Sequence, residues 1–188
     1  MRLDHIAYRV KDRYKTAKFF EEAFNYSVEK EFQIEFEDGT TADCLALTPV
    51  ENRSMSTDFW TLHHALKPMS RNNNTMEHCV YHAPPEIFVS DGPDGSIVGD
   101  WVSERGNIGG IHHIAYQVAD INVAMNDWKE KGYVEFLSTL PMECPGLKQI
   151  FTKPSELTGV IYELIERTGD GFCEDNVKDL MNSTKDLS

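Results

Sequence analysis

The sequence predicts an α+β fold made of two paired βαβββ modules and a C-terminal helix. The first observation is a repeat: the tetrapeptide His-Ile-Ala-Tyr occurs at His5–Tyr8 and again at His113–Tyr116, an offset of 113 − 5 = 108 residues. The match continues in the same register, since Val10 corresponds to Val118. The second observation is that hydrophobic periodicity predicts the same order of elements, β-α-β-β-β, in both halves. Two copies of one unit that face each other would bring the two histidines together.

The first module is expected to occupy residues 1–100. In its first strand, the face that carries Ile6, Tyr8 and Val10 is the more apolar one. This face is expected to pack under a helix, which leaves His5 on the opposite face of the sheet. The expected elements are a strand at 3–10, a helix N-capped by Asp12, strands at 28–38 and 41–48 around a turn at Asp38-Gly39, a strand at Glu86–Val89 and a short helix at Ser96–Arg105.

Residues 50–77 interrupt the first module. They are rich in Ser, Asn, Thr, Met and Arg, and we expect an insertion or a long loop, because structureless loops of this length are usually functional or mobile. A second group of histidines lies in and after this segment, and a solvated loop is the favoured interpretation for it: His63, His64, His78 and His82.

The second module is expected to occupy residues 101–168. Its first strand places His113 on the same face as Gln117. His112 falls on the opposite face, so we expect it to support the site indirectly or to be structural. The expected elements are a strand at 111–118, a helix capped by Asp120 that ends at Gly132, strands near 133–138, 147–153 and 159–165, and a helical tail within 169–188.

Composition and charge narrow the functional classes. The net charge of −13 argues against nucleic acid or an anionic membrane as a partner, since both need a basic face. No signal peptide and no apolar run of membrane-spanning length is recognised. The four cysteines form no CxxC pair, which indicates reduced thiols and a cytoplasmic location. There is no GxSxG, GxGxxG or P-loop motif. We expect a small-molecule partner, and the oligomeric state stays open with a homodimer as one option.

Each module offers one histidine and one glutamate as candidate metal ligands. Glu163 lies in an apolar strand, where a buried carboxylate is costly without a partner, and a divalent metal would supply that partner. Glu86 lies in the corresponding strand of the first module. A single strand histidine is more often structural than a ligand, but equivalent pairs in both halves favour a metal site. The candidate ligands are His5, Glu86, His113 and Glu163, a set that suits Fe(II), Mn, Co, Ni or Zn.

Several segments are similar to those of the vicinal-oxygen-chelate superfamily, also called the glyoxalase/bleomycin resistance/dioxygenase superfamily. In the first module these are Leu3-Asp4-His5-Ile6-Ala7 and Phe19-Phe20-Glu21-Glu22. The resemblance covers nearly the whole chain except residues 50–77. It implies paired βαβββ modules that form an open, mostly antiparallel, barrel-like sheet around a metal site.

The C-terminal part resembles the catalytic half of 4-hydroxyphenylpyruvate dioxygenase. The similar segments are Gly110–Ala115, Val134–Ser138, Gln149–Pro154, and Gly171-Phe172 followed by Asn176, Lys178 and Leu180. The resemblance implies a substrate contact at Gln149 and a gating helix beside Phe172, which would stack on an aromatic ring. Val177 stands where that family has a second phenylalanine, a departure from the pattern for an aromatic substrate. The implied Fe(II) ligands are His5, His113 and Glu163.

Other segments resemble methylmalonyl-CoA epimerase and its glyoxalase relatives. These are the stretch from Gly92-Pro93-Asp94 to Gly109–Ala115, and Thr158–Leu164. In that branch Glu86 falls at the place of a fourth metal ligand, and Glu163 fits one of two catalytic glutamates.

These resemblances lead to three candidate functions. We favour an Fe(II) dioxygenase that acts on a 2-oxo acid, because the run from Gln149 to Leu180 is longer and less generic than the epimerase segments. Fe(II) is therefore the favoured cofactor, with Co, Ni, Mn or Zn as other options. The alternative is a metal-dependent isomerase or epimerase, in which a metal polarises a carbonyl and a carboxylate moves the α-proton. A metal contact from Glu86 would favour it. A non-catalytic small-molecule binding protein ranks third, because such members usually lack the metal ligands that this chain keeps.

Overall fold

The computed structural model describes residues 1–49, 85–168, 173–185 and 187. The predicted insertion at 50–77, its histidine-rich zone and Phe172 lie outside the described residues. The first half contains β1 (Arg2–Arg9), α1 (Arg13–Phe24), β2 (Tyr26–Glu35), β3 (Thr41–Pro49), β4 (Glu86–Asp91) and α4 (Ile97–Glu104). The second half contains β5 (Gly110–Gln117), α5 (Ile121–Glu130), β6 (Met142–Cys144), β7 (Leu147–Phe151), β8 (Ile161–Arg167) and α6 (Glu174–Ser183).

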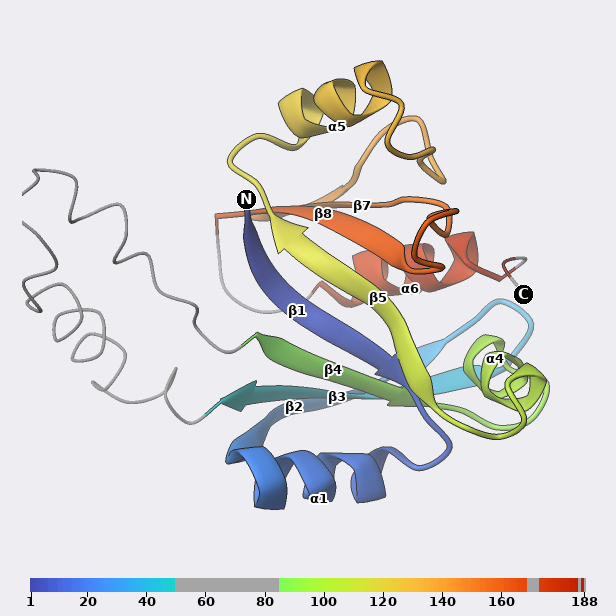
Figure 1. The fold of residues 1–188 in the computed structure, drawn as a ribbon. Coiled ribbons are helices and arrows are strands. Elements are labelled where there is room, and N and C mark those ends of the chain that lie inside the picture. The colour runs from blue at the N-terminus through green and yellow to red at the C-terminus, as the bar shows by residue number, and fades with distance from the viewer. Residues whose placement is uncertain (50–84, 169–172, 186, 188) are drawn as a thin grey trace, which may run out of the picture.

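The described strands form one eight-stranded sheet in the order β2-β3-β4-β1-β5-β8-β7-β6. Strand β1 runs parallel to β4, and β5 runs parallel to β8, while the other neighbours are antiparallel. The first strands of the two modules, β1 and β5, lie side by side at the centre of the sheet (Figure 1). The predicted α+β fold with an open, mostly antiparallel sheet is therefore confirmed, and the two copies of His-Ile-Ala-Tyr lie on adjacent strands.

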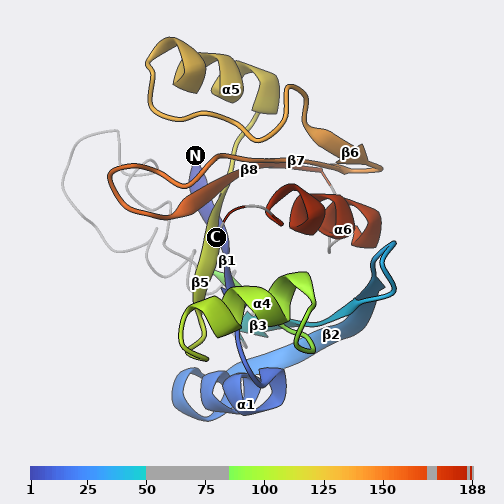
Figure 2. The same ribbon diagram turned by 90° about the vertical axis from the view of Figure 1, so that its right-hand side faces the viewer.

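The sheet curls, and its two faces carry different helices. Helices α1 and α5 lie on the outside of the curve, and α6 lies inside it between the two ends of the sheet (Figure 2). Helix α6 contacts β2 at one end of the sheet and β6 and β7 at the other end of the sheet. The predicted C-terminal helix is thus confirmed, and it covers the concave face on which His5 was expected.

The outer helices begin where the sequence predicts. Asp12 accepts a hydrogen bond from the Lys15 backbone N–H, and Asp120 accepts one from Val123 in the same way. Each cap satisfies an amide that the first helical turn would otherwise leave unpaired. Under α1, Ile6 and Tyr8 pack against a buried cluster that includes Val10 and Ala17, as the alternation in the first strand predicts.

The prediction of a strand near residues 133–138 is wrong. In that segment the structure has a single bridge, between Phe136 and Thr152, and the strand next to β7 is the short β6 instead. Phe136 does pack against the core under α5, which explains the apolar pattern. Beyond this bridge residues 137–140 bend, and the Ser138 hydroxyl donates to the Leu140 carbonyl instead of a neighbouring strand.

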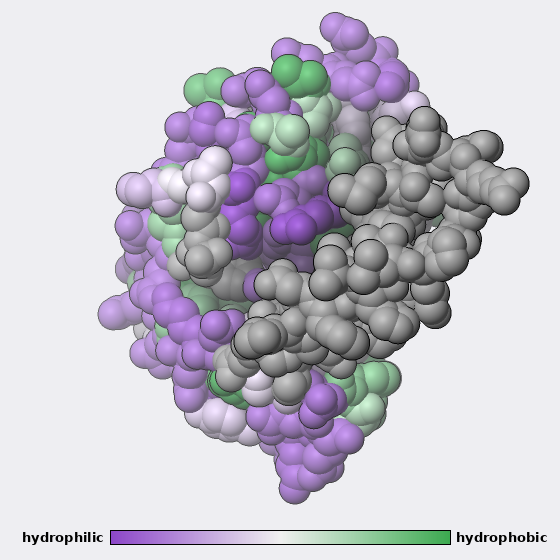
Figure 3. Space-filling model, turned by 90° about the vertical axis from the view of Figure 1, so that its left-hand side faces the viewer, coloured by the Kyte–Doolittle hydropathy of each residue, from purple (hydrophilic) through white to green (hydrophobic). Residues whose placement is uncertain are grey.

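The described residues on one face of the molecule are mostly polar. On the face drawn in Figure 3, hydrophilic residues predominate and hydrophobic ones form small separate areas, in keeping with the strongly acidic composition. Among the helices of the described residues, none combines the length and hydrophobicity that crossing a membrane requires.

Candidate metal centre

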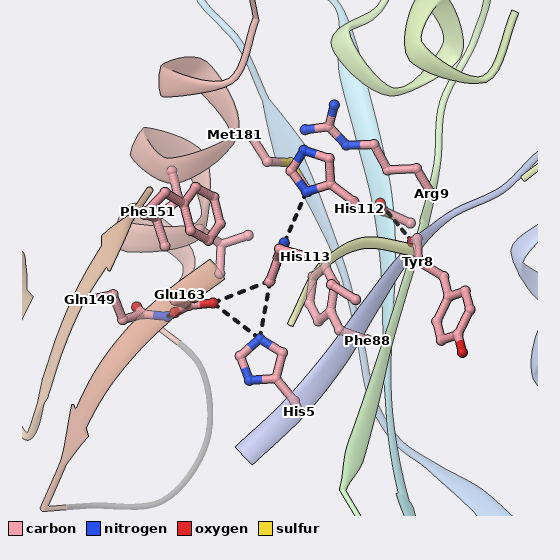
Figure 4. Close-up of a pocket in the computed structure, with 14 residues that line it drawn as sticks. His5, Tyr8, Arg9, Phe88, His112, His113, Gln149, Phe151, Glu163 and Met181 are labelled. Atoms are coloured by element: carbon pink, nitrogen blue, oxygen red, sulfur yellow. Dashed lines mark hydrogen bonds and ion pairs between the residues drawn. The ribbon is translucent and has the colours of Figure 1, made fainter. Parts of the chain in front are cut away.

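Three buried side chains from three strands meet on the concave face. They are His5 of β1, His113 of β5 and Glu163 of β8, which are 2%, 9% and 1% exposed. The Nε2 atoms of the two histidines are 3.2 Å apart, and Glu163 Oε2 lies 3.3 Å from His5 Nε2 and 3.2 Å from His113 Nε2 (Figure 4). Two parts of the sequence 108 residues apart, and a third near the C-terminus, therefore converge on one point.

The donor set fits a divalent metal ion. A metal with bonds of about 2.0–2.2 Å to nitrogen and oxygen places its ligand atoms about 3.0 Å apart at right angles and about 3.4 Å apart at tetrahedral angles. The three separations in the structure, 3.2, 3.3 and 3.2 Å, fall within this interval. Two imidazoles and a carboxylate also form the ligand set of several transition-metal sites with open coordination positions.

β-Bulges beside both histidines change which side chains reach the site. In β1, Ala7 pairs with His113 of β5, but the next residue, Tyr8, pairs with Ile111. His112 is therefore an extra residue in β5. The prediction that His112 lies on the opposite face is wrong, because the bulge breaks the alternation and His112 lines the same cavity as His113. A second irregularity lies in β1 between Leu3 and Ile6, where Asp4 and His5 occur.

The residue before each histidine contacts that histidine. Asp4 Oδ1 lies 2.8 Å from His5 Nδ1, and His112 Nδ1 lies 2.9 Å from His113 Nδ1. Such contacts leave Nε2 facing the centre and hold the imidazole ring in place. Simple alternation does not predict them, because it separates neighbouring residues to opposite faces.

The two histidines have opposite electrostatic surroundings. Burial alone would lower the pKa of His5, but the carboxylates of Glu163 and Asp4 outweigh it and raise the pKa to about 9. Burial lowers the pKa of His113 despite the contact with Glu163. The pKa of His112 lies well below its usual value, first because of burial and then because the Arg9 guanidinium is near. Without metal at neutral pH, His5 therefore carries a proton while His113 and His112 are neutral.

A chain of amide hydrogen bonds holds Glu163. Gln149 Nε2 donates to Glu163 Oε1 at 2.6 Å, and Asn176 Nδ2 of α6 donates to Gln149 Oε1 at 3.1 Å. This leaves Oε2 facing the histidines. Burial alone would raise the pKa of Glu163, but the imidazoles of His5 and His113 hold it well below its usual value.

Gln149 lines the cavity as well as holding the carboxylate, so its role as a substrate contact stays a prediction. The chain of hydrogen bonds through Asn176 is a further part of the site that sequence reasoning missed. The available signal was a polar residue four positions before Leu180, on the buried face of an amphipathic helix.

Glu86 lies in the predicted strand but at a different register from Glu163. It pairs with His5 across β4 and β1, whereas Glu163 pairs with Ala115 across β8 and β5. Since Ala115 is the repeat equivalent of Ala7, and Ala7 pairs with Phe88, Phe88 occupies the place equivalent to Glu163.

Glu86 is half-buried, and its pKa is raised mainly by burial. It does not belong to the compact group of possible ligands that the described residues form. A metal contact from Glu86 therefore stays a prediction.

The triad lies at the wall of a mostly apolar cavity. Its apolar lining includes Phe88, Phe151, Val177, Leu180 and Met181. The last three belong to α6, so this helix closes the cavity from the concave side. Val177 is where the dioxygenase resemblance expects an aromatic residue, and Phe172, the other expected stacking residue, lies outside the described residues.

Comparisons with known proteins agree with this architecture. Residues 4–143 match the sequence family described as the Glyoxalase/Bleomycin resistance protein/Dioxygenase superfamily. A mitochondrial methylmalonyl-CoA epimerase from Bos taurus is 36% identical over 79 residues, which cover 42% of this chain and 44% of that protein. The matched segment thus spans less than half of that relative.

Solved structures share the fold at low identity. A variant of 4-hydroxymandelate synthase from Streptomyces coelicolor has a TM-score of 0.67 and 21% identity, with coverage of 97% of this chain and 54% of that chain. A methylmalonyl-CoA epimerase from Mycobacterium tuberculosis has a TM-score of 0.55 and 17% identity, with coverage of 89% of both chains. This chain therefore spans about half the length of the synthase and nearly the full length of the epimerase. Because the family match extends over well more than half of the sequence, the chain belongs to the glyoxalase/bleomycin resistance protein/dioxygenase superfamily.

Proposed function

We propose that this chain is a metal-dependent isomerase or epimerase that moves a proton on the carbon next to a carbonyl group of a small substrate. The observation that carries the proposal is the buried triad of His5, His113 and Glu163 in a chain whose named sequence relative is a methylmalonyl-CoA epimerase. The epimerase structures also support it, because they match this chain over nearly their full length. This ranking reverses the order that the sequence segments alone suggested.

The residues of the site have distinct tasks in such a reaction. A bound divalent metal would polarise the substrate carbonyl and stabilise the negative charge that develops on its oxygen. His5, His113 and Glu163 would hold the ion, and Gln149 fixes the carboxylate through Oε1. The phenyl rings of Phe88 and Phe151 and the side chains of α6 exclude water, which strengthens electrostatic interactions in the cavity.

Proton transfer needs a group that can accept a proton near the substrate carbon. Beyond the two histidines of the triad, Glu163 and His112 supply a carboxylate and an imidazole among the residues that line the cavity. We assign the transfer to one or both of these side chains.

The test is hydrogen exchange at the substrate carbon. The protein is loaded with Co(II) in D₂O and incubated with a panel of acyl-CoA thioesters and 2-oxo acids, and deuterium uptake is followed by NMR. We expect uptake that needs Co(II) and is lost in Glu163→Gln. Tight Co(II) binding without exchange on any member of the panel would contradict the isomerase assignment.

A second candidate function is an Fe(II) dioxygenase that acts on a 2-oxo acid. The observation that favours it is Phe88 at the place equivalent to Glu163, because three protein ligands would then leave open positions for substrate and oxygen. The helix α6 over the cavity and the likeness to the 4-hydroxymandelate synthase fold also support it. A bound Fe(II) ion would make the reaction of the substrate with molecular oxygen possible. The apolar lining of the cavity would exclude water.

The two candidates predict different measurements. Anaerobic loading with Fe(II), followed by oxygen uptake on a panel of aryl 2-oxo acids that includes 4-hydroxyphenylpyruvate, tests the dioxygenase. Oxygen consumption coupled to CO₂ release would establish it and displace the isomerase. Tight metal and ligand binding without either reaction would leave the binding-protein function, which ranked third.

A further inference from the structure

Arg9 is a buried cation at the end of β1. It is 2% exposed, and it lies four residues after His5 on the same face of the strand. Its side chain lines the cavity that contains the metal-binding triad. Figure 4 shows the guanidinium reaching toward His112 and Met181, away from Glu163 and Gln149. The cavity thus has the triad at one end and a positive charge at the other.

The guanidinium is only partly satisfied. Its Nη2 donates to Thr184 Oγ1 at 2.9 Å, and its Cζ lies 5.9 Å from the centroid of the Trp101 ring. Its Nη1 is buried and has no hydrogen-bond partner among the described residues. Burial, and then the neighbouring Arg105, lower the pKa of Arg9 to about 9, so the group remains charged at neutral pH. A buried charge with an unused donor is costly unless a partner completes it.

The described residues do not supply the missing partner. No carboxylate forms an ion pair with Arg9 in the described part of the chain, and the neighbouring charge that lowers the pKa of Arg9 is another cation, Arg105. Among the described residues that line the metal-site cavity, the one carboxylate is that of Glu163, which already faces the two histidines. A fixed cation opposite a metal site therefore leaves a place for a negative group that arrives with a ligand.

Arg9 also borders a second cavity, but that cavity is less suited to an anion. Its wall includes the carboxylates of Asp38, Asp100 and Glu104, and its one lysine, Lys185, already pairs with Asp38 at 3.3 Å. An anion there would meet like charges. The metal-site cavity is therefore the side on which Nη1 can be used.

We propose that Arg9 binds a carboxylate of the substrate, so that the substrate is a short dicarboxylate or oxo-dicarboxylate with one end at the metal and the other at Arg9. This inference rests on the proposed metal site and names the substrate class that the site would take. The cavity volume of about 30 Å³ favours a compact ligand. The planar fork of a guanidinium matches a carboxylate, and a substrate carboxylate would complete the unused donor.

The test compares ligands and variants by calorimetry on the Co(II)-loaded protein. The ligands are succinate and its monoamide, succinamate, which differ in one negative charge. We expect succinate to bind more tightly than succinamate in the native protein. In Arg9→Met, which keeps the apolar stem, the affinity for succinate should fall about 10- to 100-fold, while that for succinamate changes little.

Thr184→Val is the matched control, because it removes the hydroxyl that Nη2 uses and leaves the charge of Arg9 in place. If Arg9 only anchors the end of α6, both variants should lower the melting temperature alike and neither should separate succinate from succinamate. If Arg9 binds the carboxylate, only Arg9→Met removes the preference. Should Arg9→Met fail to fold, Arg9→Lys keeps the charge without the fork, and we expect it to retain the preference at reduced affinity.

Co(II) affinity is measured for every variant, so that failure of the metal site is distinguished from failure of the anion site. Normal Co(II) binding with equal succinate affinity in the native protein and Arg9→Met would overturn the inference and leave the proposed function intact. If Co(II) does not bind at all, the metal-dependent function fails, and the anion site is tested without metal. In that case acetate replaces succinate as the ligand, and saturation-transfer NMR monitors its binding to the native protein and to Arg9→Met. Equal signals for the two proteins would overturn the inference.

Discussion

The two modules place the same histidine on the same strand and then support it in opposite ways. His5 has a carboxylate, Asp4, at its Nδ1, and Asp4 in turn accepts from Arg167 at 3.0 Å. His113 has a neutral imidazole, His112, at the same atom. The carboxylate that completes the triad comes from the second module alone, because Phe88 stands at the corresponding place in the first. The two repeated units thus form an asymmetric site, in which His5 contacts a carboxylate at Nδ1 and His113 contacts a neutral imidazole.

The largest expected effect separates the two glutamates. Glu163→Gln, like His113→Ala, should lower Co(II) affinity about 100- to 1,000-fold or more, because each ligand contributes a large share of the free energy of metal binding. Glu86→Gln is the matched control and should stay within a few-fold of the native protein, since Glu86 lies outside the compact group. Calorimetric titration with Co(II) measures all three. A comparable loss in Glu86→Gln would restore a symmetric four-ligand site and strengthen the isomerase.

A smaller effect is expected from the hydrogen bonds that hold the carboxylate. Gln149→Leu removes the donor to Glu163 Oε1, and the metal affinity should fall about 10- to 100-fold, as for other residues that orient a ligand. Asn176→Leu acts one step further away and should have a weaker effect in the same direction. Gln33→Leu, which removes an exposed glutamine bonded to Asp43, serves as the control. Unchanged metal affinity in Gln149→Leu would assign that glutamine to the substrate alone.

The pH dependence of metal binding tests the difference between the two histidines. His5 has its pKa raised to about 9, so a metal must displace its proton at neutral pH, whereas the lowered pKa of His113 means that no proton is displaced there. Co(II) affinity should therefore rise about tenfold per pH unit from near neutrality and level off near pH 9. Asp4→Asn removes one of the groups that raise this pKa, and its plateau should begin at lower pH. A profile that is flat above pH 7 in the native protein would contradict the assignment.

The smallest effect is expected where the two modules are alike. Asp12→Ala and Asp120→Ala each remove an N-cap side chain and should each lower the free energy of unfolding by about 1 kcal/mol. Urea unfolding measures both, and Co(II) affinity should not change, because both helices lie on the outer face. A change in metal affinity in either variant would mean that the outer helices communicate with the site.

Much of the site could be predicted from the repeat and the alternation within strands. Equivalent strands in a paired fold become neighbours, so the histidines of the two modules had to meet, and the apolar surroundings of Glu163 predicted a buried carboxylate. The prediction for His112 and the strand near 133–138 failed for a shared reason. Alternation describes one strand at a time, whereas a bulge or the end of a ladder depends on which residues the neighbouring strand presents.

By itself, the sequence determined the α+β order of elements, the capped outer helices, the C-terminal helix and the candidate ligands His5, His113 and Glu163, because these follow from local periodicity and from the repeat. Only the tertiary structure decided that Phe88 rather than Glu86 occupies the place equivalent to Glu163, and that Asn176 reaches Gln149. It also decided that Arg9, at the other end of the cavity from the triad, keeps a donor that no described residue uses. These features depend on register between strands and on the packing of α6 against the sheet. Both are set by contacts between residues far apart in the chain, which no local pattern records.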